Sequence, residues 1–267
     1  TLELRHRNLE IEASLRVAER FYQSMVPDHP PVAPSPADAK VKMTVLQHFQ
    51  PHEGFGGDFF NVRVLDDARI GVLVCDVTGH DVRSALLAAT INGLKEQLRS
   101  EAARAGNYIT ALNRRLHGIL ETTAREMFAT AFYLVADVRS ANVCCVRAGH
   151  PKGLLRRADG TVEAIGNAGP ALGLFEEAQY ESEMVGVAPG DRVFLFTDGL
   201  YETVDEAGDE LGPEGLAAIF SDVGGGDTET VIQKVVEQVH AYSHTGKLDD
   251  DVCVVMLVME SPSETAD

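Results

Sequence analysis

The chain has 267 residues, of which 45% are hydrophobic and 24% are charged. A chain of this size buries a substantial core, and we expect one large domain with an appendage. Aspartate and glutamate number 41 against 23 lysines and arginines, and the net charge of −18, with no compact basic cluster, argues against nucleic acid as a partner. The same charge repels a phosphorylated substrate unless bound cations reverse its sign locally, so the acidity hints at metal.

The sequence has no targeting or membrane-spanning segment. No apolar run approaches the roughly 18 residues that cross a bilayer, and the N-terminus lacks a signal sequence, so we expect no membrane insertion. The four cysteines lie in apolar, strand-like runs and form no Cys-x-x-Cys pair; they are Cys75, Cys144, Cys145 and Cys253. Buried, reduced thiols suit a cytoplasmic protein.

The N-terminal segment 1–26 predicts an amphipathic helix. Largely apolar positions recur at alternating spacings of three and four from Asn8 to Met25, with charged residues between them, as in the seam of a coiled coil. The helix either lies on its own domain or pairs with a second copy, and we favour pairing and therefore a homodimer. The chain begins inside this pattern without an initiator methionine, so we expect a fragment of a longer protein.

A linker and a single folded domain follow. Residues 27–38 hold five of the eleven prolines and cannot continue a helix, so they predict a linker. We assign residues 39–260 to the folded domain and residues 261–267 to a polar tail.

The domain alternates groups of strands with groups of helices. Apolar spacing predicts strands at 41–50, 58–65 and 69–77 and then helices at 81–103 and 107–121. A second group of strands is predicted at 128–138, 141–148, 152–157, 161–165, 179–187 and 191–197, followed by helices at 213–220 and 227–243 and a last strand at 252–259. The connections between strands are too short for parallel crossovers. The fold class is therefore α+β, a sandwich with antiparallel sheets inside and helices outside.

Four segments share one form, an aspartate at the end of an apolar strand beside a glycine or another aspartate. They are Gly56-Gly57-Asp58, Cys75-Asp76-Val77-Thr78-Gly79-His80, Phe196-Thr197-Asp198-Gly199 and Asp249-Asp250-Asp251. Strand ends are where a rigid scaffold aims carboxylates at a common point. Each segment alone is more often a turn than a ligand, but the four together are far more specific.

The chemistry of this set indicates hard divalent cations. Magnesium and manganese prefer oxygen ligands, and a set of aspartates without a cysteine or histidine cluster disfavours zinc. Two such ions about 3.5 to 4 Å apart polarise a phosphoryl group and lower the pKa of a bridging water. We therefore expect two Mn²⁺ or Mg²⁺ ions and the hydrolysis of a phosphomonoester, and reading aspartates does not separate manganese from magnesium.

Together the motifs resemble the bacterial RsbU/SpoIIE branch of the protein phosphatase 2C (PPM) superfamily over roughly residues 20–259. They are Gly-Gly-Asp-Phe-Phe, Asp-Val-Thr-Gly-His, Ala148-Gly149-His150-Pro151, Pro189-Gly190-Asp191, Thr197-Asp198-Gly199-Leu200-Tyr201-Glu202 and the strand after Asp250-Asp251. The resemblance implies an αββα sandwich, a dinuclear metal centre between the sheets and serine/threonine protein phosphatase activity. It also implies a phosphorylated STAS-type anti-anti-sigma protein as substrate, in a partner-switching pathway of sigma factor regulation in the stress response, and an upstream sensor domain that signals through the N-terminal helix.

The resemblance also assigns roles to residues. It implies that Asp76 bridges the two metals together with the Val77 carbonyl, that Asp58 holds one ion, and that Asp198 and Asp250 hold the other. Catalysis would then depend on Asp58, Asp76, Asp198 and Asp250, while Asp251 follows the last ligand and could exchange roles with Asp250.

The chain departs from the branch after Gly-His, where Asp81 replaces the usual glycine and Arg83 replaces a small residue. We expect Asp81 to cap the helix that starts there. His80 lies four residues past Asp76, where a general-acid role does not transfer cleanly, and we favour a loop role for it. For His150 we expect a structural place at a sheet end.

Two other functions remain open at this stage. Gly-Gly-Asp-Phe-Phe also resembles the Gly-Gly-Asp-Glu-Phe loop of diguanylate cyclases, but Phe59 replaces the acidic residue and the other aspartate motifs would then be unexplained. The second alternative is a pseudophosphatase, an interaction module that keeps the fold and acts through partner contact.

Overall fold

The structure is a computed structural model that describes residues 25–27, 29–52, 56–79, 81–248 and 250–262. Its strands form two five-stranded antiparallel sheets. Sheet A has the order β1 (Lys42–Gln50), β10 (Val252–Glu260), β9 (Arg192–Phe196), β6 (Gly153–Arg156) and β7 (Val162–Ile165). Sheet B has the order β2 (Phe59–Val64), β3 (Arg69–Val77), β4 (Ala129–Asp137), β5 (Asn142–Ala148) and β8 (Glu183–Gly186).

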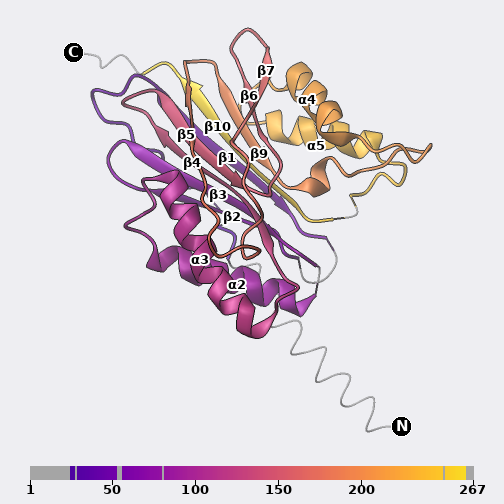
Figure 1. The fold of residues 1–267 in the computed structure, drawn as a ribbon. Coiled ribbons are helices and arrows are strands. Elements are labelled where there is room, and N and C mark those ends of the chain that lie inside the picture. The colour runs from indigo at the N-terminus through magenta and orange to yellow at the C-terminus, as the bar shows by residue number, and fades with distance from the viewer. Residues whose placement is uncertain (1–24, 28, 53–55, 80, 249, 263–267) are drawn as a thin grey trace, which may run out of the picture.

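Two pairs of helices cover the outer faces of the sheets. Helices α2 (Val82–Gln97) and α3 (Ala105–Thr123) lie on sheet B, whereas α4 (Gly212–Val223) and α5 (Val231–Tyr242) lie on sheet A (Figure 1). A short 3₁₀ turn, η1 (Asp198–Leu200), directly follows β9. The αββα sandwich expected from the sequence is confirmed. The predicted helix at 1–26 lies almost entirely outside the described residues.

Burial of β10 on both faces explains the layers. Cys253, Val255 and Leu257 belong to the core between the sheets, while Val254 and Met256, which alternate with them, pack under α4 and α5. Because side chains alternate across a strand, a strand that is apolar at every position needs cover on both faces. Among the described residues, no helix is long and apolar enough to cross a membrane. All four cysteines are free, and Cys75, Cys145 and Cys253 are buried, as the sequence predicted.

Three elements are clearly shorter than the sequence predicted, and one of them is helix α5 (Val231–Tyr242), which begins four residues after the predicted start at 227. Helix α2 ends at Gln97 rather than 103, because the chain reverses through turns so that α3 can pack beside α2. Strand β8 begins at Glu183 rather than 179, because the residues before it bind α3 instead of a strand. The backbone N–H of Tyr180 donates to Thr110 Oγ1 at 3.2 Å, and Ser182 Oγ accepts from the N–H of Gly106 at 3.0 Å.

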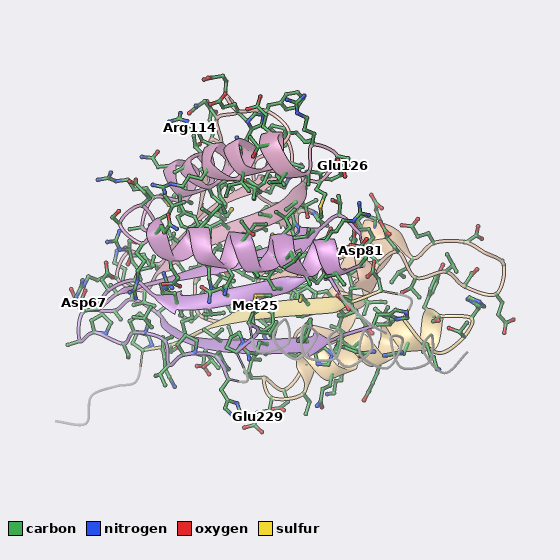
Figure 2. The ribbon with its side chains drawn as sticks, turned by 90° about the horizontal axis from the view of Figure 1, so that it is seen from below. Met25, Asp67, Asp81, Arg114, Glu126 and Glu229 are labelled. Carbon is green, nitrogen blue, oxygen red and sulfur yellow. The ribbon has the colours of Figure 1, made fainter. Side chains whose placement is uncertain are left out.

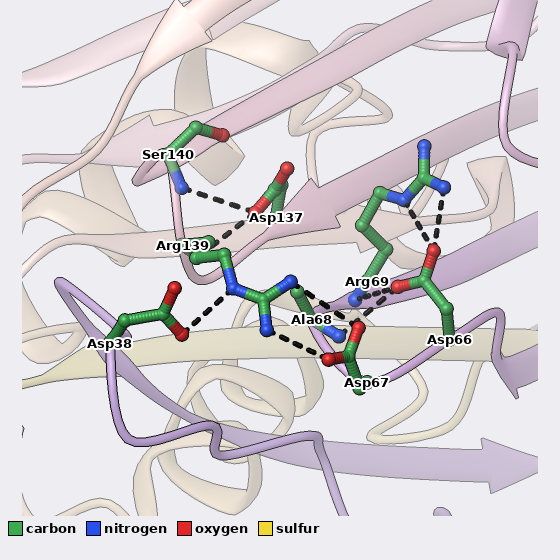
Figure 3. Close-up of polar contacts among 8 residues, drawn as sticks. All are labelled: Asp38, Asp66, Asp67, Ala68, Arg69, Asp137, Arg139 and Ser140. Atoms are coloured by element: carbon green, nitrogen blue, oxygen red, sulfur yellow. Dashed lines mark hydrogen bonds and ion pairs between the residues drawn. The ribbon is translucent and has the colours of Figure 1, made fainter.

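Arginine–aspartate contacts hold the turns at one end of sheet B (Figure 3). Arg139, in the turn between β4 and β5, donates to Asp38 at 2.8 Å and to Asp67 at 2.7 Å. Asp137 Oδ1 accepts from the N–H groups of Arg139 and Ser140. Asp67 and Asp81 lie at opposite ends of the molecule (Figure 2), so the aspartates of this turn cluster are remote from the strand ends that carry the predicted ligands.

Candidate metal centre

The pairing of β2 and β3 brings Asp58 and Asp76 together. Phe59 pairs with Cys75 across the two strands, and Asp58 and Asp76 lie one step beyond that pair. Asp58 is only 4% exposed, and its carboxyl group shares a hydrogen bond with that of Asp76. Burial and the charge of Asp76 raise the pKa of Asp58 well above its ordinary value. Two buried acids in contact favour a shared proton or a bound cation over two bare charges.

The pairing of β9 and β10 supplies the acids of the other sheet. Asp198 opens η1 immediately after β9, and Asp250 lies just before β10. Thr197 joins the two strand ends, since its N–H donates to the Cys253 carbonyl at 3.1 Å and its Oγ1 accepts from the Cys253 N–H at 3.0 Å. Thr197 also hydrogen-bonds the Asp58 side chain, which lies on sheet B. This threonine therefore connects the two halves of the centre.

Glycines allow the close approach of the backbones. A Cβ atom at Gly57 would overlap the carbonyl oxygen of Val77, and one at Gly199 would overlap the carbonyl oxygen of Asp251. Any other residue would push these strand ends apart. Packing within the sheets therefore requires the glycine beside Asp58 and the glycine beside Asp198.

Electrostatic coupling shows that the acids of the two sheets face one another. Burial and the neighbouring Asp198 raise the pKa of Asp76 to about 7, and Asp250 contributes to this rise. The pKa of Asp198 is raised by burial and by Asp250. Asp58, Asp76, Asp198 and Asp250 therefore lie in one neighbourhood, at the strand ends of the two sheets. The structure brings together the four aspartates that the sequence singled out as catalytic.

The two neighbours Asp250 and Asp251 have different surroundings. Asp251 is 2% exposed, and its Oδ1 accepts from the backbone N–H of His52 at 2.6 Å. Asp250 is exposed and lines a pocket of about 230 Å³ together with Gly199, Glu202 and Thr203. Asp250 thus lines a pocket beside Asp198, whereas Asp251 binds the segment that follows β1.

The donor set fits hard divalent cations. In the described part of the chain, no three acidic, histidine or cysteine side chains are already gathered closely enough to enclose an ion. Burial, and after it the charges of neighbouring acids, raise the pKa values of Asp58, Asp76 and Asp198, so bare carboxylates are disfavoured here. A cation would neutralise them, and an all-oxygen set suits magnesium or manganese rather than zinc.

Two residues beside the centre were missed by sequence reasoning. Glu202 lines the same pocket as Asp250, and burial and Asp198 raise its pKa. A sequence signal was available, because Glu202 follows Asp198 by four residues. In the structure the Glu202 N–H donates to the Asp198 carbonyl at 2.9 Å, which places this acid one turn past Asp198. Thr197 gave no such signal, since its bond to Asp58 depends on how the sheets stack.

Asp81 caps α2, as the sequence predicted. Its carboxylate accepts from the Arg83 N–H at 2.8 Å, and its φ of −120° is extended, so an aspartate is not strained where the resembling branch has glycine. Arg83 pairs with Asp81 at 2.9 Å on the surface. His80 lies outside the described residues.

His150 has the structural place expected for it. It is 1% exposed, its Nε2 lies 3.0 Å from the Phe196 carbonyl and its Nδ1 lies 2.7 Å from Thr130 Oγ1. Because a carbonyl only accepts, Nε2 carries the proton and Nδ1 accepts from the threonine. Thr130 pairs with Asp76 across β4 and β3, so His150 joins sheet B to sheet A directly behind the centre.

Solved structures share this fold. The SiaA-PP2C domain of Pseudomonas aeruginosa superposes with a TM-score of 0.78 at 20% identity, covering 94% of this chain and 97% of that one. The catalytic domain of the serine/threonine protein phosphatase PstP, solved with two manganese ions, superposes with a TM-score of 0.59 at 15% identity, covering 83% of this chain and 99% of that one. At these identities the likeness shows the fold, which is that of PP2C-type phosphatase domains.

The family is shown by sequence. The model of the family described as Stage II sporulation protein E (SpoIIE) matches residues 66–260, and the chain belongs to this family. The phosphoserine phosphatase RsbP of Bacillus subtilis (strain 168) is 26% identical over 162 residues, which are 60% of this chain and 40% of RsbP. The chain spans less than half the length of the curated relatives it matches.

Proposed function

We propose that this chain is a metal-dependent serine/threonine protein phosphatase that removes phosphate from phosphoserine or phosphothreonine on a partner protein. The observation that carries the proposal is the convergence of Asp58 and Asp76 from sheet B with Asp198 and Asp250 from sheet A, with raised pKa values for the three more buried acids. Membership of the SpoIIE family and the similarity to a phosphoserine phosphatase support it.

The chain's own residues would divide the work by sheet. Asp58, Asp76 and the Val77 carbonyl would hold cations from sheet B, and Asp198 and Asp250 would hold them from sheet A. Asp251, engaged by His52, would fix the position of Asp250. Bound cations would neutralise the phosphoryl oxygens and lower the pKa of an attacking water. Thr197 and His150 would hold the two sheets in register behind the ligands.

We propose two ions, either manganese or magnesium, with Asp76 shared between them. The PstP domain, which has the same fold, holds two manganese ions. The surroundings of Asp76 include carboxylates of both sheets, namely Asp58, Asp198 and Asp250, and this place between the sheets suits a bridging ligand. Titration with Mn²⁺ by calorimetry would give the number of ions bound, and Asp76→Asn should weaken both sites.

For the partner we propose a phosphorylated STAS-type anti-anti-sigma protein in a partner-switching pathway. The proposal rests on the similarity to RsbP and RsbU, both phosphoserine phosphatases of Bacillus subtilis. The test is release of phosphate from a STAS protein phosphorylated on serine, compared with an unrelated phosphoserine protein of equal size. Equal rates on both would contradict a dedicated STAS substrate.

We further propose that segment 1–26 pairs two copies and relays the signal of an upstream sensor domain. Its heptad-like spacing is the support, because residues 1–24 lie outside those that the structure describes. Light scattering at tens of micromolar on the full chain and on a chain lacking 1–26 would test it. A full chain that stays monomeric, with activity unchanged by the deletion, would remove the idea.

The deciding experiment is hydrolysis of p-nitrophenyl phosphate with Mn²⁺, with Mg²⁺ and with chelator. We expect turnover that requires metal and falls at least about a hundredfold in Asp76→Asn and in Asp198→Asn, because each removes a ligand oxygen charge from the centre. Asp222→Asn is the matched control, since Asp222 is exposed on α4. Metal binding without turnover on this or any phospho-STAS substrate would favour the pseudophosphatase instead.

A further inference from the structure

A second pocket, of about 400 Å³, lies beside the candidate centre, between the outer face of sheet A and the start of α4. Apolar side chains make up most of its wall: Leu154 of β6, Phe196 of β9, Tyr201 after η1 and Ala217 of α4. The metal centre as described does not use this pocket.

One segment of chain lines both this pocket and the pocket that contains Asp250. Phe196 and Tyr201 line the apolar pocket, while Gly199, Glu202 and Thr203 of the same segment line the pocket of Asp250. Asp198 lies on this segment too. The short stretch 196–203 therefore contributes lining residues to both pockets.

The walls of the pocket are already in place. Leu154 and Phe196 are 6% and 3% exposed and pack in the core under α4. The rings of Phe196 and Tyr201 meet edge to face, with centroids 6.1 Å apart and an interplanar angle of 85°. A preformed apolar pocket binds an apolar side chain without a further ordering cost to the protein.

The size and lining of the pocket indicate what it can receive. Its lining includes one exposed cation, Lys152, and one exposed acid, Glu214, so the rim carries no net charge of its own and the apolar wall decides what binds. A volume of about 400 Å³ accommodates one large apolar side chain, and not a folded domain.

We infer that this pocket is a specificity subsite that receives an apolar side chain close in sequence to the phosphoserine of the substrate protein. The inference rests on the proposed phosphatase function and adds to it a requirement in the substrate. It assigns Ala217 and Phe196 to substrate selection, separate from the residues that hold cations.

The test uses phosphoserine peptides with an alanine background, in which leucine or phenylalanine occupies each position from three before to three after the phosphoserine in turn. For the wild-type chain we expect one position at which an apolar residue raises kcat/KM roughly tenfold or more over the all-alanine peptide. Ala217→Phe should abolish this preference by filling the pocket. Ala218→Phe, on the exposed side of the same helix, is the matched control and should keep it.

Ala164→Phe fills the same pocket from an exposed position of β7, so the test does not depend on one variant that fails to fold. Both pocket variants should hydrolyse p-nitrophenyl phosphate at the wild-type rate, because this substrate does not reach the pocket. Absence of any apolar preference, or a preference that survives both substitutions, would overturn the subsite while leaving the phosphatase intact. Absence of p-nitrophenyl phosphate turnover in the wild-type chain would instead overturn the phosphatase function, and the subsite with it.

Discussion

His150 is held at both ring nitrogens, one bound to each sheet. The Phe196 carbonyl accepts from Nε2 and Thr130 Oγ1 donates to Nδ1, so the neutral ring satisfies both contacts and is fully buried. A protonated ring would leave Nδ1–H facing a threonine that then has to reverse its own hydrogen bond. Burial accordingly lowers the pKa of His150 from 6.5 to about 3.

This pKa predicts a loss of stability in mild acid. The unfolded chain takes up a proton on His150 near pH 6.5 and the folded chain does not until about pH 3, so the free energy of unfolding falls as the pH drops between these values. His150 should contribute about 2 kcal/mol of this fall between pH 6.5 and 5. In urea unfolding at pH 7 and at pH 5, His150→Gln should be less stable than the wild type at pH 7 but lose less on acidification, and the exposed control His244→Gln should behave as wild type.

The Asp250–Asp251 pair allows a second prediction at this scale. Asp250→Asn should weaken Mn²⁺ binding at least about tenfold and leave the melting temperature of the metal-free chain nearly unchanged, because Asp250 is exposed and faces the pocket. Asp251→Ala should lower the free energy of unfolding by about 1–3 kcal/mol, because it removes a buried carboxylate that accepts from the N–H of His52. Calorimetric titration with Mn²⁺ measures the metal-binding role of Asp250, and thermal melts measure the structural role of Asp251. The reverse pattern would make Asp251 the ligand.

At the scale of elements, helix α2 starts a few residues after β3, the strand that carries Asp76. Asp81 caps its first turn just after the loop that follows Val77, so the end of β3 and the start of α2 are fixed within a few residues of each other. The helix also carries a buried cation, Lys95, which is 5% exposed. Burial, with repulsion from Arg63, lowers the pKa of Lys95 to about 8.

The buried charge of Lys95 should therefore lower the free energy of unfolding at neutral pH. Its folded pKa lies below the ordinary value of 10.5, so the penalty of the buried charge is complete below about pH 8 and is relieved as the pH rises toward 10.5. Lys95→Met should raise the free energy of unfolding at pH 7 by roughly 2–3 kcal/mol, with the gain vanishing near pH 10.5. Urea unfolding across this range measures it, with exposed Lys234→Met as the control. A gain that does not depend on pH would contradict a buried charge.

At the scale of the whole molecule, the centre opposes folding. Asp58 is buried and Asp76 and Asp198 are half-buried, and burial together with the charges of neighbouring acids raises the pKa of all three, on a chain whose net charge is −18. The apolar core on both faces of β10 supplies the stability that offsets this repulsion. A site kept for function at a cost in stability is common in enzymes.

Removing one of these negative charges should raise the free energy of unfolding of the metal-free chain. The metal-free Asp76→Asn chain should be more stable than the metal-free wild type at pH 8 by roughly 1–3 kcal/mol, because one buried like charge is gone. Added Mn²⁺ should stabilise the wild type and not the variant. Thermal melts with and without chelator measure both effects. Equal stability of the two metal-free chains would mean that the acids do not repel one another.

The sequence by itself determined the αββα layers and the set of acids. Strand alternation, the fully apolar last strand and short connections depend on local spacing, and glycine–aspartate pairs at strand ends are visible wherever they occur. Which acids face one another was decided only by the tertiary structure, because it depends on the register of β2 with β3 and of β9 with β10 and on the stacking of the two sheets. The same reason explains why Thr197, Glu202, the separation of Asp250 from Asp251 and the apolar pocket behind η1 were not predicted. Thr197 and the apolar pocket depend on contacts between residues far apart in the chain, which local periodicity does not record. Glu202, Asp250 and Asp251 are local in sequence, but only the fold decides where their side chains lie.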